Sequence, residues 1–229
     1  MKRKKIGIIT GSGPEAGIDL WQKILKINKE ILGKDFNGDL DAPNVTILSV
    51  PELGHSMELE KNYHMVWEIL EKAVREICKK VDYFVIACNT LNLYSNKIEQ
   101  IYLKHKFIST YDVVKDYLID NALHEACIIG ALPVIEMKDY SAFKSLKNEF
   151  DIEVPKDGKK VHSLIYDLKK EGGETKNVIG KFKDIVCDIK AKNIFLACTE
   201  LPLISYSSSE KNLIDVTDLL AKKLVEKTF

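Results

Sequence analysis

Two stretches of the chain repeat one pattern, and this repetition constrains the fold more than any other feature. Residues 85–93 read VIACNTLNL and residues 195–203 read FLACTELPL, so each is an apolar run that ends in a cysteine, polar residues and further leucines. Apolar runs between polar turn residues are typical of buried strands. We therefore expect Cys88 and Cys198 at the carboxyl ends of two equivalent strands, the edge at which open α/β sheets bind ligands.

Strand-like runs alternate with segments of helical period along the rest of the chain. We predict strands at residues 5–10, 45–50, 83–88, 107–109, 126–129 and 194–198, and among the helices one at 62–79 and a final one at 216–227. This alternation indicates an α/β fold with parallel strands and helices on the sheet faces.

A weak internal duplication supports two similar halves. GIITGSGP at residues 7–14 and CIIGALP at 127–133 each read as a strand, a glycine and a proline, and each precedes one of the cysteine strands. We predict two similar α/β domains with mainly parallel sheets, related by pseudo-twofold symmetry, with the active site in the cleft between them. The first domain would comprise residues 1–105 and 212–229, and the second 106–211.

Composition excludes several classes of protein. Lys+Arg and Asp+Glu are both 34, so no net charge attracts nucleic acid or an anionic membrane, and no apolar stretch approaches the ~20 residues of a membrane helix. The five cysteines form no CxxC pair and no zinc-like spacing with histidine, which predicts no metal site and a cytoplasmic location. Cys78, Cys127 and Cys187 fall in apolar patterns and are expected in the core.

The residues after each cysteine favour acid/base chemistry. A thiol has a reference pKa of about 8.5, which hydrogen-bond donors can lower toward neutrality. Cys88 is followed by Asn89 and Thr90, and Cys198 by Thr199, so side-chain and backbone donors can meet a thiolate or a substrate carboxylate. Inverting a carbon centre needs a base on one face and an acid on the other, and two cysteines can supply both. A single cysteine of this kind would more often be core, and a cysteine hydrolase would need a histidine motif that is not evident here.

The glycine-rich segment GSGPEAG at residues 11–17 follows the first predicted strand. It lacks the spacing of a dinucleotide fingerprint and the Gly-Lys-Ser/Thr ending of a Walker loop. We interpret it as a tight turn that presents backbone donors to a small anionic substrate, with a purely structural use of glycine as the alternative.

Taken together, these motifs resemble the aspartate/glutamate racemase family, which is independent of pyridoxal phosphate, and within it the aspartate racemase branch. The matching segments, in chain order, are the loop 11–17, a Pro51 segment, Cys88-Asn89-Thr90, Lys159-Lys160 ahead of a helix at 161–168, and Cys198-Thr199-Glu200. The resemblance implies Cys88 and Cys198 as the two bases, no cofactor, a small amino-acid substrate and a homodimer.

The resemblance also implies substrate-binding residues. The α-carboxylate would be held by Asn89, Thr90 and Thr199, with Ser12 in the glycine loop near the substrate. Lys159, or Lys160 beside it, would bind the side-chain carboxylate. Glu52 and Glu200 complete the candidate site.

Two segments depart from the family pattern. Pro51-Glu52 stands where the branch tends to have Pro-Gln, and a carboxylate there repels a dicarboxylic substrate unless it turns away or pairs with the substrate ammonium. Where the family usually has threonines that contact ligand, this chain has Ala131, Leu132, Pro133 and Val134. Acidic specificity is therefore less strongly indicated than racemisation.

We expect a racemase acting on aspartate or glutamate through two thiols. The alternatives are a related isomerase or decarboxylase of another small carboxylate, and a catalytically silent protein that binds an amino acid or dicarboxylate.

Overall fold

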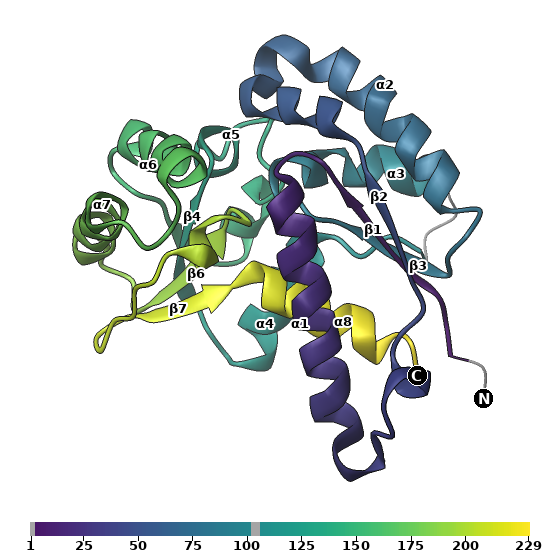
Figure 1. Cartoon of the computed structure of the whole chain (residues 1–229). Coiled ribbons are helices and arrows are strands. Elements are labelled where there is room, and N and C mark those ends of the chain that lie inside the picture. The colour runs from purple at the N-terminus through teal and green to yellow at the C-terminus, as the bar shows by residue number, and fades with distance from the viewer. Residues whose placement is uncertain (1–2, 102–105) are drawn as a thin grey trace.

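Two parallel β-sheets form the centre of the molecule (Figure 1). The computed structural model describes residues 3–101 and 106–229. The first sheet has the order β2-β1-β3 and the second the order β5-β4-β6-β7. Their bounds are β1 Ile6–Thr10, β2 Val45–Ser49, β3 Tyr83–Ile86, β4 Glu125–Gly130, β5 Asp151–Glu153, β6 Asn193–Ala197 and β7 Asn212–Asp215. Every strand pair is parallel, which confirms the predicted α/β class.

The two sheets share one topology. In each, the first strand of the half lies between the second and the third, so β1 corresponds to β4 and β3 to β6. A single parallel bridge between Phe107 and Phe84 of β3 occupies the position that β7 has beside β6. All five residues of β1 are buried, as expected for a strand covered on both faces, whereas the edge strand β2 is partly exposed.

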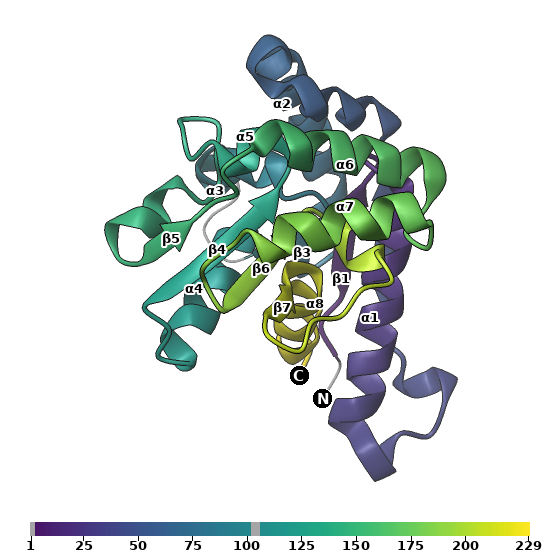
Figure 2. The same ribbon diagram turned by 90° about the vertical axis from the view of Figure 1, so that its left-hand side faces the viewer.

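Helices cover both sheets (Figures 1 and 2). α1 begins with proline at its first position, where the missing amide costs no hydrogen bond. On the second half, α6 and α7 lie side by side. The helices are α1 Pro14–Leu32, α2 Leu59–Ile77, α3 Ser95–Ile101, α4 Thr110–Asp120, α5 Leu132–Ile135, α6 Gly158–Glu171, α7 Lys176–Cys187 and α8 Val216–Glu226, and the 3-10 helices are η1 Gly33–Asp35, η2 Asp39–Asp41, η3 Pro51–Glu58, η4 Thr90–Tyr94, η5 Lys144–Asn148 and η6 Leu201–Leu203.

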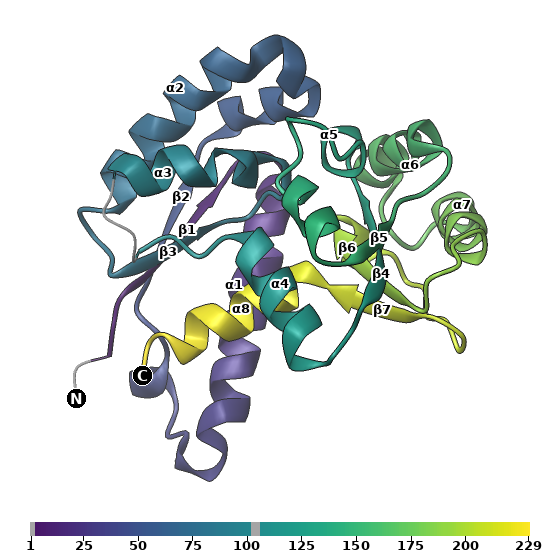
Figure 3. The ribbon, with the colours of Figure 1, turned by 180° about the vertical axis from the view of Figure 1, so that it is seen from behind.

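The last helix joins the two halves. α8 follows β7 of the second sheet and packs against both α1 and α4 (Figure 3). An ion cluster supports this contact, because Lys23 of α1 pairs with Asp19 on its own helix and with Asp215 at the end of β7. The predicted packing of the final helix on the first half is therefore present, but α8 contacts the second half as well.

Several domain limits and one core residue that we predicted from the sequence need correction. Asn212–Asp215 pairs with β6, so these residues extend the second sheet and not the first domain to which we assigned them. Phe107, assigned to the second domain, bridges to the first sheet instead. Residue 105, our limit of the first domain, lies outside the described residues, and the rest of the division stays a prediction. Cys78 and Cys127 are buried, but Cys187 ends α7 and is exposed.

No helix among residues 3–101 and 106–229 is long and apolar enough to cross a membrane.

Candidate active site

Cys88 and Cys198 lie at equivalent places in the two halves. Cys88 comes two residues after β3, and Cys198 directly follows β6, so both stand at the carboxyl end of the third strand of their sheet. Their exposures are only 9% and 8%. A short 3-10 helix begins soon after each, η4 after Cys88 and η6 after Cys198. The predicted equivalence of the two thiols is therefore present in the structure.

The Cys88 thiol is linked to two serine hydroxyls. Its Sγ lies 3.6 Å from Oγ of Ser12, and that hydroxyl lies 2.9 Å from Oγ of Ser56. Ser12 comes from the glycine loop after β1, as the sequence predicted, and Ser56 comes from η3. Both serines are buried, so the thiol contacts a short chain of hydroxyls shielded from water. Sequence reasoning did not identify Ser56, because a serine in a 3-10 turn carries no distinctive signal.

Asn92 fixes the backbone at Cys88. Its side-chain amide donates to the carbonyl of Cys88 at 2.9 Å, and its Oδ1 accepts from the amide of Thr110 at 2.8 Å. The side chain is almost fully buried. Asn92 thus ties the loop that carries the first thiol to the start of α4.

The Cys198 thiol contacts a carboxylate. It donates to Oε2 of Glu200 at 3.0 Å, and the hydroxyl of Thr199 donates to the same oxygen at 3.2 Å. Lys169 Nζ lies 2.8 Å from the other oxygen, Oε1. Burial raises the pKa of Cys198 well above its ordinary value, the adjacent Glu200 raises it further, and Lys169 opposes this only in part. Cys198 is therefore held as a neutral thiol in this arrangement.

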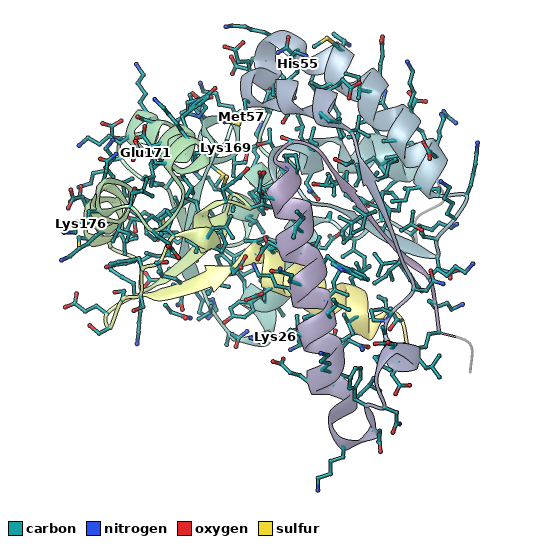
Figure 4. The ribbon with its side chains drawn as sticks, in the orientation of Figure 1. Lys26, His55, Met57, Lys169, Glu171 and Lys176 are labelled. Atoms are coloured by element: carbon teal, nitrogen blue, oxygen red, sulfur yellow. The ribbon has the colours of Figure 1, made fainter. Side chains whose placement is uncertain are left out.

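The groups around Lys169 raise the pKa of its ammonium. Burial lowers the pKa of this ammonium, but Glu200 and then Cys198 and Cys88 raise it, and the net effect is a raised pKa. Lys169 belongs to the last turn of α6, which runs from beside α5 toward the start of α1 in Figure 2. Figure 4 shows its side chain on the part of α6 nearest the first half. The ammonium thus lies close to the acid/base candidates of both halves.

Gly13 brings the glycine loop against the second half. Its φ is +98°, a conformation that favours glycine. A Cβ atom at this position would lie 2.4 Å from Oε1 of Glu200 and 3.7 Å from Nζ of Lys169. The glycine therefore permits a close approach of the loop to the Cys198 group, and the two halves of the candidate site meet there.

The structure places the other predicted residues as follows. Asn89 and Thr90 are buried beside Cys88, and Thr199 is buried beside Cys198. Among the residues that the structure describes, none is a hydrogen-bond partner for the buried Oδ1 of Asn89, which leaves this atom free to meet a polar ligand group. Glu52 is exposed at the start of η3.

The predicted lysines do not join this cluster. Lys159 and Lys160 are exposed in the first turn of α6, and Lys159 is ten residues, or about 15 Å of helix, before Lys169. Sequence reasoning missed Lys169 because it expected the functional lysine at the beginning of this helix.

No group of three or more His, Cys, Asp or Glu side chains in the described part of the chain is arranged to hold a metal ion.

Comparisons with known proteins bear on the fold and on the family resemblance. No protein-family model matches the chain. The broad specificity amino-acid racemase RacX of Bacillus subtilis (strain 168) is 25% identical over 225 residues, which cover 96% of each chain. The structure of Picrophilus torridus aspartate racemase has a TM-score of 0.81 at 20% identity, covering 98% of this chain and 94% of that chain. Glutamate racemase isoform RacE1 from Bacillus anthracis has a TM-score of 0.69 at 16% identity, covering 99% and 82%. The resemblance that the motifs indicated is confirmed in sequence and in fold.

Proposed function

Because the chain has the fold of the aspartate/glutamate racemases over almost its whole length, we propose that it is an amino-acid racemase, an isomerase, that uses Cys88 and Cys198 as opposed acid and base. The observation that carries the proposal is the pair of thiols at equivalent strand ends, with Glu200 and its partner Lys169 beside the second thiol. No cofactor takes part in the proposed reaction.

The two thiols have different surroundings, and these indicate that Cys198 is protonated before the reaction begins. Cys198 is a thiol that donates to Glu200, so we assign it as the acid, and the opposed Cys88 is then the base in this direction of the reaction. The thiolate takes the Cα proton from one face and becomes a thiol. The carbanion then takes the proton of Cys198 on the opposite face, which leaves a thiolate beside Lys169. The reverse reaction exchanges the two roles.

The substrate carboxylate has candidate partners next to each thiol. Asn89 and Thr90 follow the base, and Thr199 follows the acid. Hydrogen bonds from these groups to the α-carboxylate stabilise the negative charge that develops when the Cα proton leaves. The unpartnered Oδ1 of Asn89 is suited to the substrate ammonium, a donor that the substrate-free site does not supply.

The test is proton NMR in D₂O with a panel of L- and D-amino acids that includes aspartate and glutamate. We expect deuterium at Cα as the other enantiomer forms, and a loss of racemisation of at least 10³-fold in Cys88→Ala and in Cys198→Ala. Cys187→Ala removes an exposed thiol at the end of α7 and serves as the matched control.

Each variant also keeps one thiol, so any remaining exchange should affect one enantiomer only. If no amino acid exchanges its Cα proton, the racemase proposal fails. Consumption of the substrate instead would support a decarboxylase, and binding without exchange would support a silent binding protein. The homodimer and the cytoplasmic location stay predictions.

A further inference from the structure

We propose that Ser56 is a positioning residue for the Cys88 base: its hydroxyl, acting through Ser12, favours the ionised form of that thiol. This inference rests on the proposed racemase function and names a residue on which the first proton transfer depends. Sγ of Cys88 lies 3.6 Å from Oγ of Ser12, which lies 2.9 Å from Oγ of Ser56. The three side chains therefore form a row with two contacts, and Ser56 is at its far end.

The two serines are shielded from solvent. Ser12 is 6% exposed and Ser56 only 1%. Within residues 3–101 and 106–229, Ser12 is the only hydrogen-bond partner of the Ser56 hydroxyl. A hydroxyl in such a place has to use the contacts of this row, because a buried polar group without a partner costs free energy.

The number of hydrogens in the row decides which form of Cys88 it favours. A serine hydroxyl has one hydrogen to donate and can rotate toward either neighbour. If Cys88 is a thiol, its own hydrogen and the two hydroxyl hydrogens compete for two contacts, so one donor stays unpaired. If Cys88 is a thiolate, the two hydroxyl hydrogens fill both contacts, since Ser56 donates to Ser12 and Ser12 donates to Sγ. The buried row therefore favours the thiolate.

Ser56 acts on the thiolate without touching it. Without its hydroxyl, Ser12 could still donate to Cys88, but the Ser12 oxygen would lose the donor on its other side. A hydroxyl that accepts a hydrogen bond is polarised by it and becomes a stronger donor, above all where the surroundings have a low dielectric constant. Removing Ser56 should therefore weaken the bond from Ser12 to Sγ.

Cys198 has the opposite kind of partner. Its thiol meets the carboxylate of Glu200 at 3.0 Å, and a carboxylate disfavours a second negative charge beside it. Hydroxyls at one thiol and a carboxylate at the other give the two groups different affinities for a proton, as a base and an acid require at the start of a turnover.

The same contacts can follow the change of protonation during the reaction. When the Cα proton moves to Sγ, the new thiol can donate to Ser12, and the Ser12 hydroxyl can turn toward Ser56. The hydroxyls only rotate about their Cβ–Oγ bonds, and no proton passes between them. Cys88 can thus lose its charge while the heavy atoms around it stay in place.

The backbone holds the two serines together. Gly11, with a φ of +124°, lies so close to Val50 that a Cβ atom would be 2.1 Å from the Val50 carbonyl oxygen. The amide of Val50 donates to the carbonyl of the last residue of β1 at 2.8 Å, which ties the glycine loop to the start of η3. Figure 4 shows His55 and Met57, the neighbours of Ser56, above the loop between β1 and α1.

The test is the pH dependence of Cys88 alkylation by iodoacetamide without substrate, followed by mass spectrometry of the Cys88 peptide. The midpoint of this profile reports ionisation, whereas a change in access to the thiol alters only the plateau. Because each serine contributes to a hydrogen bond with a charged group, we expect the midpoint to rise by about one pH unit in Ser12→Ala and by at least about half a unit in Ser56→Ala.

A double variant and two controls separate this role from a structural one. Since Ser56 acts through Ser12, the Ser12→Ala, Ser56→Ala double variant should have the midpoint of Ser12→Ala alone. Ser56→Thr keeps a hydroxyl and should keep the wild-type midpoint. Ser141→Ala removes another buried hydroxyl, one that donates to the Val134 carbonyl at 2.6 Å, and should leave the midpoint unchanged. Circular dichroism checks folding, and the alanine variants decide alone if Ser56→Thr does not fold.

Turnover gives a second readout. In Ser56→Ala the low-pH limb of kcat/KM should move to higher pH by the same shift, with the pH-independent maximum within threefold of the wild type. Activity that falls equally at every pH, with an unchanged alkylation midpoint, would make Ser56 a purely structural residue and overturn the inference.

The outcomes separate this inference from the function on which it rests. Additive shifts in the double variant also overturn the role of Ser56 and leave the racemase function intact. Alkylation needs no substrate, so shifted midpoints without Cα exchange for any amino acid would support the link from Ser56 to Cys88 and remove the proposed function itself.

Discussion

Replacing Glu200 by glutamine should lower the pKa of Cys198. The Sγ to Oε2 distance is 3.0 Å, and Coulomb's law at an effective dielectric constant of ~20 gives about 5.5 kcal/mol for two unit charges at that separation. This is an upper bound, since the carboxylate charge is shared by two oxygens and Lys169 offsets part of it. We therefore expect a lower pKa for Cys198 in Glu200→Gln, because the repulsion that favours the neutral thiol is removed.

The assay is the reaction of Cys198 with an aromatic disulfide at pH 7.5, followed by mass spectrometry of the peptide that contains it. Each unit of lower pKa raises the thiolate fraction about tenfold, but the intrinsic nucleophilicity falls with a Brønsted coefficient of about 0.4–0.5. The net gain is about 3- to 4-fold per unit, so we expect the Cys198 rate to rise at least about threefold.

Glu171→Gln is the matched control. It removes an equal charge two residues from Lys169, but Glu171 is exposed and bonds Thr175 and Asn177. A Cys198 rate in folded Glu200→Gln within twofold of the wild type would refute the view that this carboxylate holds the proton on the thiol. A lower pKa of Cys198, the proton donor, should also move the high-pH limb of activity, where this thiol loses its proton, to lower pH.

Three further predictions concern positions around the site and one core thiol. Asn92→Ala leaves two buried backbone groups unpaired and should lower the free energy of unfolding in urea by about 2–4 kcal/mol, so a loss below 1 kcal/mol would contradict its bridging role. Gly13→Ala should reduce kcat at least tenfold because the new Cβ meets Glu200, whereas Gly38→Ala, at a φ of +103° with open space around it, should leave kcat unchanged. Burial raises the pKa of Cys78 to about 11, so its contribution to stability is present below about pH 9 and is lost as pH rises toward 11. Urea unfolding at pH 8 and pH 10.5 should show a smaller loss in Cys78→Ala than in the wild type, and equal losses would argue against this assignment.

The pattern of apolar residues in the sequence was sufficient to predict the central strands of both sheets. The apolar runs of β1, β4 and β6 are buried on both faces, so their composition alone marks them as central parallel strands. The strands that the sequence missed are short edge strands, β5 with three residues and β7 with four. Edge strands bury less of their surface and carry polar residues, so their pattern hardly differs from that of a loop.

The candidate site residues that directly follow a buried strand could be predicted from the sequence. The ends of β3 and β6 fix the positions of Cys88 and Cys198. They also fix the positions of the residues that follow each cysteine in the sequence. Lys169 was not predictable in this way, because its position depends on how far α6 extends across the sheet edge. The role of Glu200 toward Cys198 also depended on a side-chain direction that a motif of consecutive residues does not specify.

Each thiol is hydrogen-bonded within its own half. Ser12 and Ser56 accompany Cys88 in the first half, whereas Thr199, Glu200 and Lys169 accompany Cys198 in the second. A rigid-body separation of the halves would therefore open the space between the thiols without breaking any of these bonds. Its energetic cost would come from the packing at the Gly13 contact and along α8. Substrate entry and product release then require no rearrangement of either proton-transfer group, and the protonation state left by one turnover can persist while the molecule opens and closes.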